Sequence, residues 1–364
     1  MTAIRLRGPG DVLASIPYQL GYHPSDSVVV LGLHDGAVEL VERLDLPEPA
    51  GVVDAAAALV GPLVRERIEA VLLAGFESSA ELAAPMLDAL VGPLCEAEIA
   101  VLERLVVRDG RWFSLDCTQG CCPPEGQPLP EPASTPAVAD FVGQGVSPLP
   151  DRAQVAATVR ADPAVSDLVA IELAKDEAPG RPAAARRMAW LSLWAVVCRS
   201  DPDRFLPEEL SAPDVAELVH SLRDIELRDA LIAWLCPGSL PLEALPDDLV
   251  DAVGSALSPR SPASSGTLAA AAARVLRGRL EWLARAVPDP DAAPVLTMLA
   301  TVAWHLGDGT VARVALDRAL EHAPDYRLAQ LIARLIDLGI RPGVAARSTA
   351  TRRGVTVQSP DAAR

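Results

Sequence analysis

A chain of 364 residues is long for one hydrophobic core, so we expect two or three domains. Its formal net charge of −17 argues against a nucleic-acid-binding protein, because phosphate contacts need clustered positive charge. No segment approaches the roughly 20 apolar residues of a membrane-spanning helix, and the first residues lack the apolar run of a signal peptide. We therefore expect a cytoplasmic protein that binds neither nucleic acid nor membranes.

Residues 1–130 alternate between strand and helix patterns. A short strand at Ile4–Arg7 leads through the Gly8-Pro9-Gly10 turn into a helix that we expect to begin at Asp11, its N-cap. The remaining patterns predict strands at Ser27–Leu33, Ala37–Leu44, Ala70–Gly75, Ile99–Val107 and Arg111–Leu115, and helices at Val52–Glu66 and from a Ser78–Ser79 cap to Cys95. Two of the strand pairs are hairpins, which an all-parallel sheet cannot contain. The segment is therefore predicted to be an α/β domain with a mixed sheet.

The directions of these strands place the loops at two edges of the sheet. With right-handed crossovers, the Gly8–Gly10 turn, the His34–Gly36 hairpin and the loop at Cys117 emerge at one edge. The segments His23–Asp26 and Glu77–Ser79 emerge at the opposite edge.

Beyond residue 130 the patterns change. Residues 131–150 are rich in proline and glycine and form a linker or a wrapping loop, in which Val138–Val142 alone has a helical pattern. Residues 151–340 are predicted to be an all-α domain, because apolar residues recur there every three or four positions. Residues 341–364 carry arginines among small polar residues and are predicted to be a disordered basic tail.

One part of the helical domain resembles a tetratricopeptide unit, a pair of antiparallel helices. The pattern consists of Trp304-His305-Leu306-Gly307-Asp308, Ala312, Ala319-Leu320 and Pro324. Such units need stacked neighbours to bury their faces. We expect the preceding helices to supply them.

Three of the six cysteines, Cys117, Cys121 and Cys122, fall within six residues. The spacing of the first two fits half of a zinc site, and redox or reactive thiols are a further reading. The favoured reading is that these are reduced thiols in a structural loop, since no second ligand pair lies nearby. Zinc is therefore a candidate cofactor only at this cluster.

A second candidate site is a ligand rim made of Gly8, Gly10, Asp11, His34 and Asp35. Free backbone N–H groups at the start of a helix can hold an anion. However, Pro9 removes one donor and Asp11 adds negative charge, so a tight turn with its cap is the favoured reading.

Three stretches resemble an actinobacterial family called domain of unknown function 4192. They are Arg7-Gly8-Pro9-Gly10-Asp11 with Pro17-Tyr18 and Gly21–Val30, then Cys121-Cys122-Pro123-Pro124-Glu125-Gly126, and finally Leu306–Gly309 through Arg318-Ala319-Leu320 to Leu328-Ala329. The likeness spans residues 4–340 and departs from the family pattern at Thr118-Gln119-Gly120, where an Asp-Pro step is more usual. The resemblance implies an actinobacterial cytoplasmic protein and implies no reaction.

Taken together, the sequence favours a non-enzymatic protein-interaction or regulatory module whose helical domain binds a protein or peptide partner. The alternative is an enzyme or small-ligand-binding protein that uses the rim formed by the Gly8–Gly10 turn and the Cys117–Cys122 loop. No catalytic residue is assigned, because no motif of an established reaction occurs.

Overall fold

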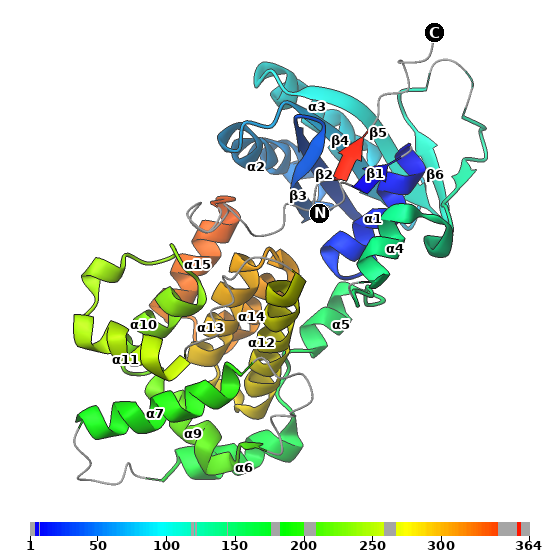
Figure 1. The fold of residues 1–364 in the computed structure, drawn as a ribbon. Coiled ribbons are helices and arrows are strands. Elements are labelled where there is room, and N and C mark those ends of the chain that lie inside the picture. Colours follow the sequence, from blue (N-terminus) through cyan, green and yellow to red (C-terminus); the bar gives the residue numbers. More distant parts are fainter. Residues whose placement is uncertain are drawn as a thin grey trace. The chain divides into compact units, whose positions relative to one another are not determined.

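The computed structural model describes residues 4–6, 8–117, 120, 122–143, 145–175, 183–199, 209–257, 267–340 and 355–357 (Figure 1). Contacts divide the chain into two compact units. The sheet unit comprises residues 1–152 and 352–364, and the helical unit comprises residues 153–351.

The sheet unit is built on one eight-stranded sheet with the order β1-β8-β3-β2-β4-β5-β6-β7. The strands are β1 (Ile4–Leu6), β2 (Ser27–His34), β3 (Ala37–Asp45), β4 (Ala70–Phe76), β5 (Ala100–Arg108), β6 (Arg111–Ser114), β7 (Gln127–Pro128) and β8 (Val355–Val357). The pairs β1–β8 and β4–β5 are parallel and the other pairs are antiparallel. The prediction of a mixed sheet is therefore confirmed.

Helices cover both faces of this sheet, because the central strand β2 is apolar on both sides. Val29 and Leu31 contribute to a core with α1 (Pro9–Leu20). Val28 and Val30 contribute to the opposite core with α2 (Val52–Arg65) and α3 (Ala84–Glu96). Alternation of side chains along a strand produces this division into two cores.

Two helix starts differ from the prediction. Helix α1 begins at Pro9 and not at Asp11, since the fixed φ of proline suits the first helical position. Helix α3 begins at Ala84 and not after Ser78–Ser79. The preceding residue, Ala83, packs so closely on Gly75 that an added Cβ there would lie 2.5 Å from the Ala83 Cβ. The chain from Glu77 to Ala83 therefore closes a tight loop before it turns helical.

Residues 131–150 fold against the sheet unit. They contain a 3-10 turn at Pro132–Ser134 and α4 (Pro136–Gly143), whose Phe141 ring lies 5.9 Å from that of Tyr18. At their end, the Leu149 N–H donates to Gly21 O at 2.8 Å. These contacts hold the segment against the sheet unit.

The expected disordered tail falls mostly outside the described residues. Residues 355–357 are described, and they form β8 between β1 and β3. The sequence analysis did not predict this strand. For these three residues a strand replaces the expected disorder.

The helical unit is α-helical in its described residues, as predicted for residues 151–340. Its helices, the first of which begins at the boundary of the units, are α5 (Arg152–Ala157), α6 (Pro163–Leu173), α7 (Ala183–Val197), α9 (Ala212–Ser221), α10 (Ile225–Leu235), α11 (Asp247–Leu257), α12 (Thr267–Ala286), α13 (Ala293–His305), α14 (Gly309–His322) and α15 (Arg327–Asp337). Helix α13 is central, because every residue from 295 to 303 is buried and α10, α12, α14 and α15 all pack against it. Across the described part of the chain, no helix combines the length and the apolar character needed to span a membrane.

Buried polar groups join the helices of this unit. The Trp194 Nε1 of α7 donates to Ser221 Oγ of α9 at 2.9 Å. Arg318 of α14 is 8% exposed, and it donates to the backbone oxygens of Ala284 and Val287 at 2.8 and 3.1 Å and to that of Val159. These carbonyls lie at the ends of helical segments, where no further turn satisfies them.

Candidate functional site

Three side chains that can bind a metal ion meet at one edge of the sheet. His34 and Asp35 lie in the β2–β3 hairpin, and Glu69 immediately precedes β4. One donor atom from each lies within 4.8 Å of the others. His34 Nε2 is 3.8 Å from Asp35 Oδ2, and His34 Nδ1 is 3.4 Å from Glu69 Oε1.

Local backbone geometry produces this meeting. The hairpin turn places both Asp35 and Gly36 at positive φ, 50° and 72°, as a two-residue type I′ turn requires. Arg67 also has a positive φ of 55°, and its carbonyl oxygen lies 3.1 Å from His34 Nδ1. Glu69 is fixed by its own backbone N–H, which donates to Leu33 O at 3.0 Å.

The contacts of the Gly8–Gly10 turn, which is part of the predicted rim, show where this turn lies. Gly8 is the N-cap of α1 and Asp11 lies in its first turn. At Gly10, an added Cβ would lie 3.0 Å from Pro130 Cγ and 3.5 Å from Trp112 Nε1. Gly10 is therefore a close-approach glycine beside β6.

The sheet register gives two different levels for this turn. Through β8 and β3, Arg5 of β1 is level with Ala37, which pairs with His34. Through β5 and β4, Trp112 is level with Ser27, at the opposite end of β2. The structure brings His34 and Asp35 together with Glu69, and their shared rim with the Gly8–Gly10 turn stays a prediction.

The cysteine cluster lies beyond the end of β6. Cys117 and Cys122 are half-buried, whereas Cys121 is outside the described residues. Within the described ranges, neither Cys117 nor Cys122 belongs to a group of three side chains that could hold a metal ion. The zinc reading of the full cluster therefore stays a prediction.

An ion pair fixes the chain just before Cys117. Asp116 accepts from the backbone N–H of Arg104 at 2.8 Å and from its Nη2 at 2.5 Å. Burial opposes the charged carboxylate, but these bonds outweigh it and lower the pKa of Asp116. The same arginine also pairs with Asp88 of α3 at 2.5 Å. These contacts fix the position of the chain at the end of β6.

At the opposite edge, polar side chains organise loops. Asp26 accepts from the backbone N–H of Ser78 at 2.8 Å and from its hydroxyl at 3.1 Å. Glu77, with a side chain 1% exposed, accepts from the Ala83 N–H at 2.9 Å and pairs with Arg108 at 2.5 Å. The bond from Ala83 to Glu77 joins the end of β4 to the start of α3. These polar side chains therefore hold loops in place.

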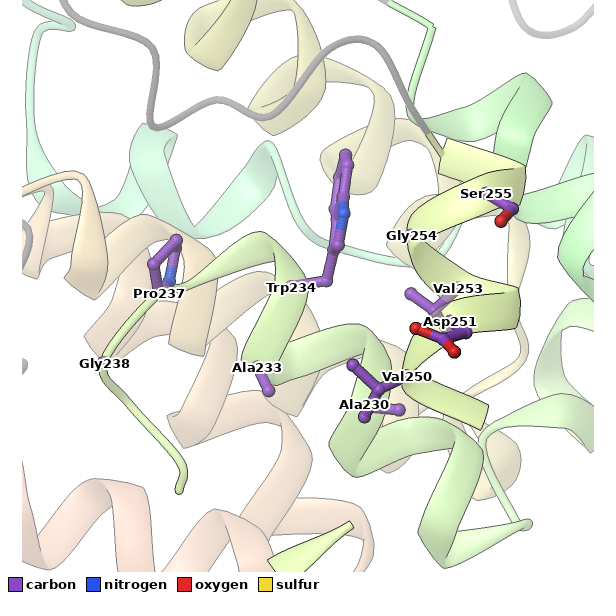
Figure 2. Close-up of a pocket in the computed structure, with 10 residues that line it drawn as sticks. All are labelled: Ala230, Ala233, Trp234, Pro237, Gly238, Val250, Asp251, Val253, Gly254 and Ser255. Atoms are coloured by element: carbon purple, nitrogen blue, oxygen red, sulfur yellow. The ribbon is translucent and has the colours of Figure 1, made fainter. Parts of the chain in front are cut away.

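The helical unit contains a pocket of about 650 Å³ between α10 and α11 (Figure 2). Helix α10 and the loop after it contribute Ala230, Ala233, Trp234, Pro237 and Gly238, and α11 contributes Val250, Asp251, Val253, Gly254 and Ser255. Small and aliphatic side chains form its walls, Trp234 is half-buried, and the only charged group of the lining is the exposed Asp251. The pocket is suited to an apolar group with a cationic neighbour.

Two cysteines of the helical unit, the half-buried Cys198 and the buried Cys236, do not line this pocket. Burial raises the pKa of Cys236, and it raises the pKa of Cys198 to about 12. Both therefore stay as unreactive thiols at neutral pH, since the thiolate is the nucleophile.

The sequence analysis did not identify Glu69 or the pocket. Glu69 is 34 residues from Asp35 in the sequence, and the sheet register alone brings the two side chains together. The pocket depends on Ala230, Ala233 and Gly254, whose small side chains leave space between two helices. Small residues at these positions have no pattern that distinguishes a pocket from close packing. The one local signal was the Pro237-Gly238 turn between the helices.

The fold defines a class of protein that consists of a unit with a mixed α/β sheet and a helical unit. The chain belongs to the family described as Domain of unknown function (DUF4192), whose sequence profile matches residues 9–343. The resemblance given by the three motifs is thereby confirmed. No curated protein and no solved structure matches the chain.

Proposed function

We propose that this protein is a non-enzymatic interaction module whose helical unit binds a peptide segment of a partner protein. The pocket between α10 and α11 is the observation that carries the proposal. Its volume of about 650 Å³ lies within the range of pockets that bind small ligands and large side chains. An aromatic or leucine side chain of the partner occupies part of it, and neighbouring peptide groups occupy the rest.

The lining favours binding over catalysis. It contains one carboxylate, Asp251, and one hydroxyl, Ser255, both exposed, and it contains no histidine, lysine or cysteine. A nucleophile needs an adjacent base within hydrogen-bond reach. The lining therefore offers an apolar anchor with a single negative charge.

Charge indicates the chemistry of the partner. Glu243, Asp247, Asp248 and Asp251 are all exposed, and no described residue forms an ion pair with any of them. Asp247 and Asp248 also stabilise α11, because carboxylates interact favourably with the first turn of a helix. A peptide with an apolar anchor followed by arginine or lysine complements both the pocket and these carboxylates.

The likeness to a tetratricopeptide unit is part of this proposal. Helices α13 and α14 form a hairpin whose turn contains Gly307 at a φ of 84°, and Asp308 Oδ1 caps α14 by accepting from the Val311 N–H at 3.1 Å. Helix α15 packs on both. This arrangement supports a rigid helical platform. The cytoplasmic location is likewise proposed, and fractionation of cells that express a tagged chain tests it.

The test blocks the pocket without disturbing the fold. An added Cβ at Gly254 meets no atom within 4 Å, so Gly254→Leu places a side chain in the pocket and also favours the helix. Random 12-residue peptides are displayed and selected against the full chain. We expect enrichment of an aromatic residue or leucine next to arginine or lysine, and at least tenfold weaker binding to Gly254→Leu.

Gly278→Leu is the matched control. Gly278 lies in α12, an added Cβ there also meets no atom within 4 Å, and it does not line the pocket. We expect this variant to bind the selected peptides as the natural chain does. Equal binding by Gly254→Leu, or selection of acidic peptides, would overturn the proposal.

A further inference from the structure

We propose that His34, Asp35 and Glu69 form a binding site for a transition-metal dication, of which Zn²⁺ is the probe of choice. An imidazole and two carboxylates supply three donor atoms within 4.8 Å of one another. Two ligands of a tetrahedral zinc ion lie about 3.4 Å apart, given bonds of about 2.0–2.1 Å. The three side chains are exposed, so rotation about their side-chain bonds is the movement that would bring the donor atoms to that spacing.

The orientation of the imidazole supports this assignment. His34 Nδ1 lies 3.1 Å from Arg67 O. Because a carbonyl oxygen only accepts, Nδ1 carries the hydrogen in this contact, which leaves the lone pair on Nε2. Metal-binding histidines commonly donate their other ring N–H to a backbone carbonyl in this way. Nε2 faces Asp35 at 3.8 Å, whereas Glu69 Oε1 lies 3.4 Å from Nδ1, so the Glu69 side chain has to turn toward Nε2 to bind the same ion.

The two carboxylates are held close together. Glu69 Oε2 accepts from the backbone N–H of Asp35 at 3.2 Å, which keeps its side chain over the hairpin turn. Among the described residues, His34 is the only ionisable side chain within ion-pair distance of Asp35 or Glu69. A bound dication neutralises this local negative charge.

The donor set and the exposure indicate the class of metal. Imidazole suits Zn²⁺, Ni²⁺ and Cu²⁺ better than Mg²⁺ or Ca²⁺, which prefer oxygen ligands. The side chains of His34, Asp35 and Glu69 are 42%, 89% and 59% exposed. Solvent therefore has access to the remaining coordination positions.

The test is calorimetric titration of the full chain with Zn²⁺, after Cys117, Cys121 and Cys122 are all replaced by serine so that thiols do not compete. We expect one equivalent to bind, with at least tenfold weaker affinity in His34→Gln and a smaller loss in Glu69→Gln. His23→Gln is the matched control, because His23 is an exposed histidine of the same unit. We expect His23→Gln to bind Zn²⁺ with the same affinity as its parent.

Co²⁺ spectra of the natural chain identify the ligands. We expect d–d bands that His34→Gln abolishes, with no sulfur-to-cobalt charge-transfer band. The proposal is wrong if the chain without the three clustered thiols binds no Zn²⁺, if His34→Gln binds as tightly as its parent, or if the cobalt signal depends on the cysteines instead. Peptide binding through the helical unit is a separate measurement, so either proposal can fail alone.

Discussion

The charged side chains that the two units bury have opposite signs. In the sheet unit, the buried carboxylate of Glu77 accepts from the Ala83 N–H beside the start of α3. In the helical unit, the buried guanidinium of Arg279 donates to Val196 O in the last turn of α7, and that of Arg318 donates to carbonyls at the end of α12. A helix start leaves backbone N–H groups unpaired, so a buried helix start is stabilised by a negatively charged acceptor. A helix end leaves C=O groups unpaired, so a buried helix end is stabilised by a positively charged donor.

Glu77 and Arg318 both support structure, and the group of ligand atoms found among the described residues lies in the sheet unit. The sheet brings side chains from distant strands to one edge, as with His34 and Glu69. The helices bring small side chains together and leave an apolar pocket. This difference explains why the metal proposal concerns the sheet unit and the peptide proposal concerns the helical unit.

Removal of the arginine anchor is the strongest test of the comparison. Arg318→Leu leaves three backbone carbonyls and Asp289 without their donor, so we expect a loss of about 3–5 kcal/mol in the free energy of unfolding. Urea denaturation followed by tryptophan fluorescence measures it. Five of the six tryptophans lie between residues 153 and 351, so this signal reports mainly on the helical unit.

Arg313→Ala is the control for that experiment. Arg313 lies on the same helix and pairs with Asp337 at the surface. An exposed pair contributes about 0–1 kcal/mol, so we expect a small change. If Arg318→Leu also changes the unfolding free energy by less than about 1 kcal/mol, the buried arginine is not an anchor.

The carboxylate anchor is expected to matter less, because its partner is partly exposed. Arg108→Met leaves the buried Glu77 carboxylate with one backbone donor, and we expect a loss of about 2 kcal/mol. Thermal unfolding followed by the sheet signal in circular dichroism measures it. The double variant Glu77→Leu with Arg108→Met is expected to recover part of the loss, since no unpaired charge remains. No recovery would show that the pair is not the cause.

The smallest expected effect is a pH dependence in the helical unit. His305 is half-buried at the end of α13, and burial lowers its pKa below the ordinary 6.5. The folded state therefore keeps this imidazole neutral while the unfolded state takes up a proton. Stability that is present above pH 6.5 is lost as the pH falls below 6.5 toward the lowered pKa.

His305→Gln removes this titration. We expect the unfolding free energy of the natural chain to fall more between pH 7 and pH 5 than that of the variant, and urea denaturation at each pH measures the difference. Parallel pH profiles would contradict the assignment. The other histidines stay in place in both proteins and serve as the internal reference.

Much of the sheet unit follows from local patterns. The β-branched run and the Asp35-Gly36 turn predicted β2 and β3 to within one residue at each end. Strand directions were also predictable, because hairpins and right-handed crossovers leave few choices. The start of α3 was not predictable, since the close approach of Ala83 to Gly75 and the bond to Glu77 are tertiary contacts that override a Ser-Ser cap signal.

The candidate sites were predictable only where residues are neighbours in the chain. His34 and Asp35 were identified as ligand candidates from the hairpin, but Glu69 joins them through the pairing of β2 with β4. Gly10 was assigned to the same rim from strand direction alone. In the structure Gly10, the second residue of α1, lies close to Trp112 of β6. Direction gives the edge at which a strand ends, and it does not give the position of the helix that follows.

The participation of β8 in the sheet has a consequence for synthesis of the chain. Strand β1 pairs with β8 alone, and some 350 residues separate Ile4 from its partner Val355. An early strand therefore gains its neighbour only after the whole helical unit has left the ribosome. The edge of β1, and that of β3 at Ala37, lack their partner during that delay, so a chain that stalls late in translation is vulnerable to self-association through them.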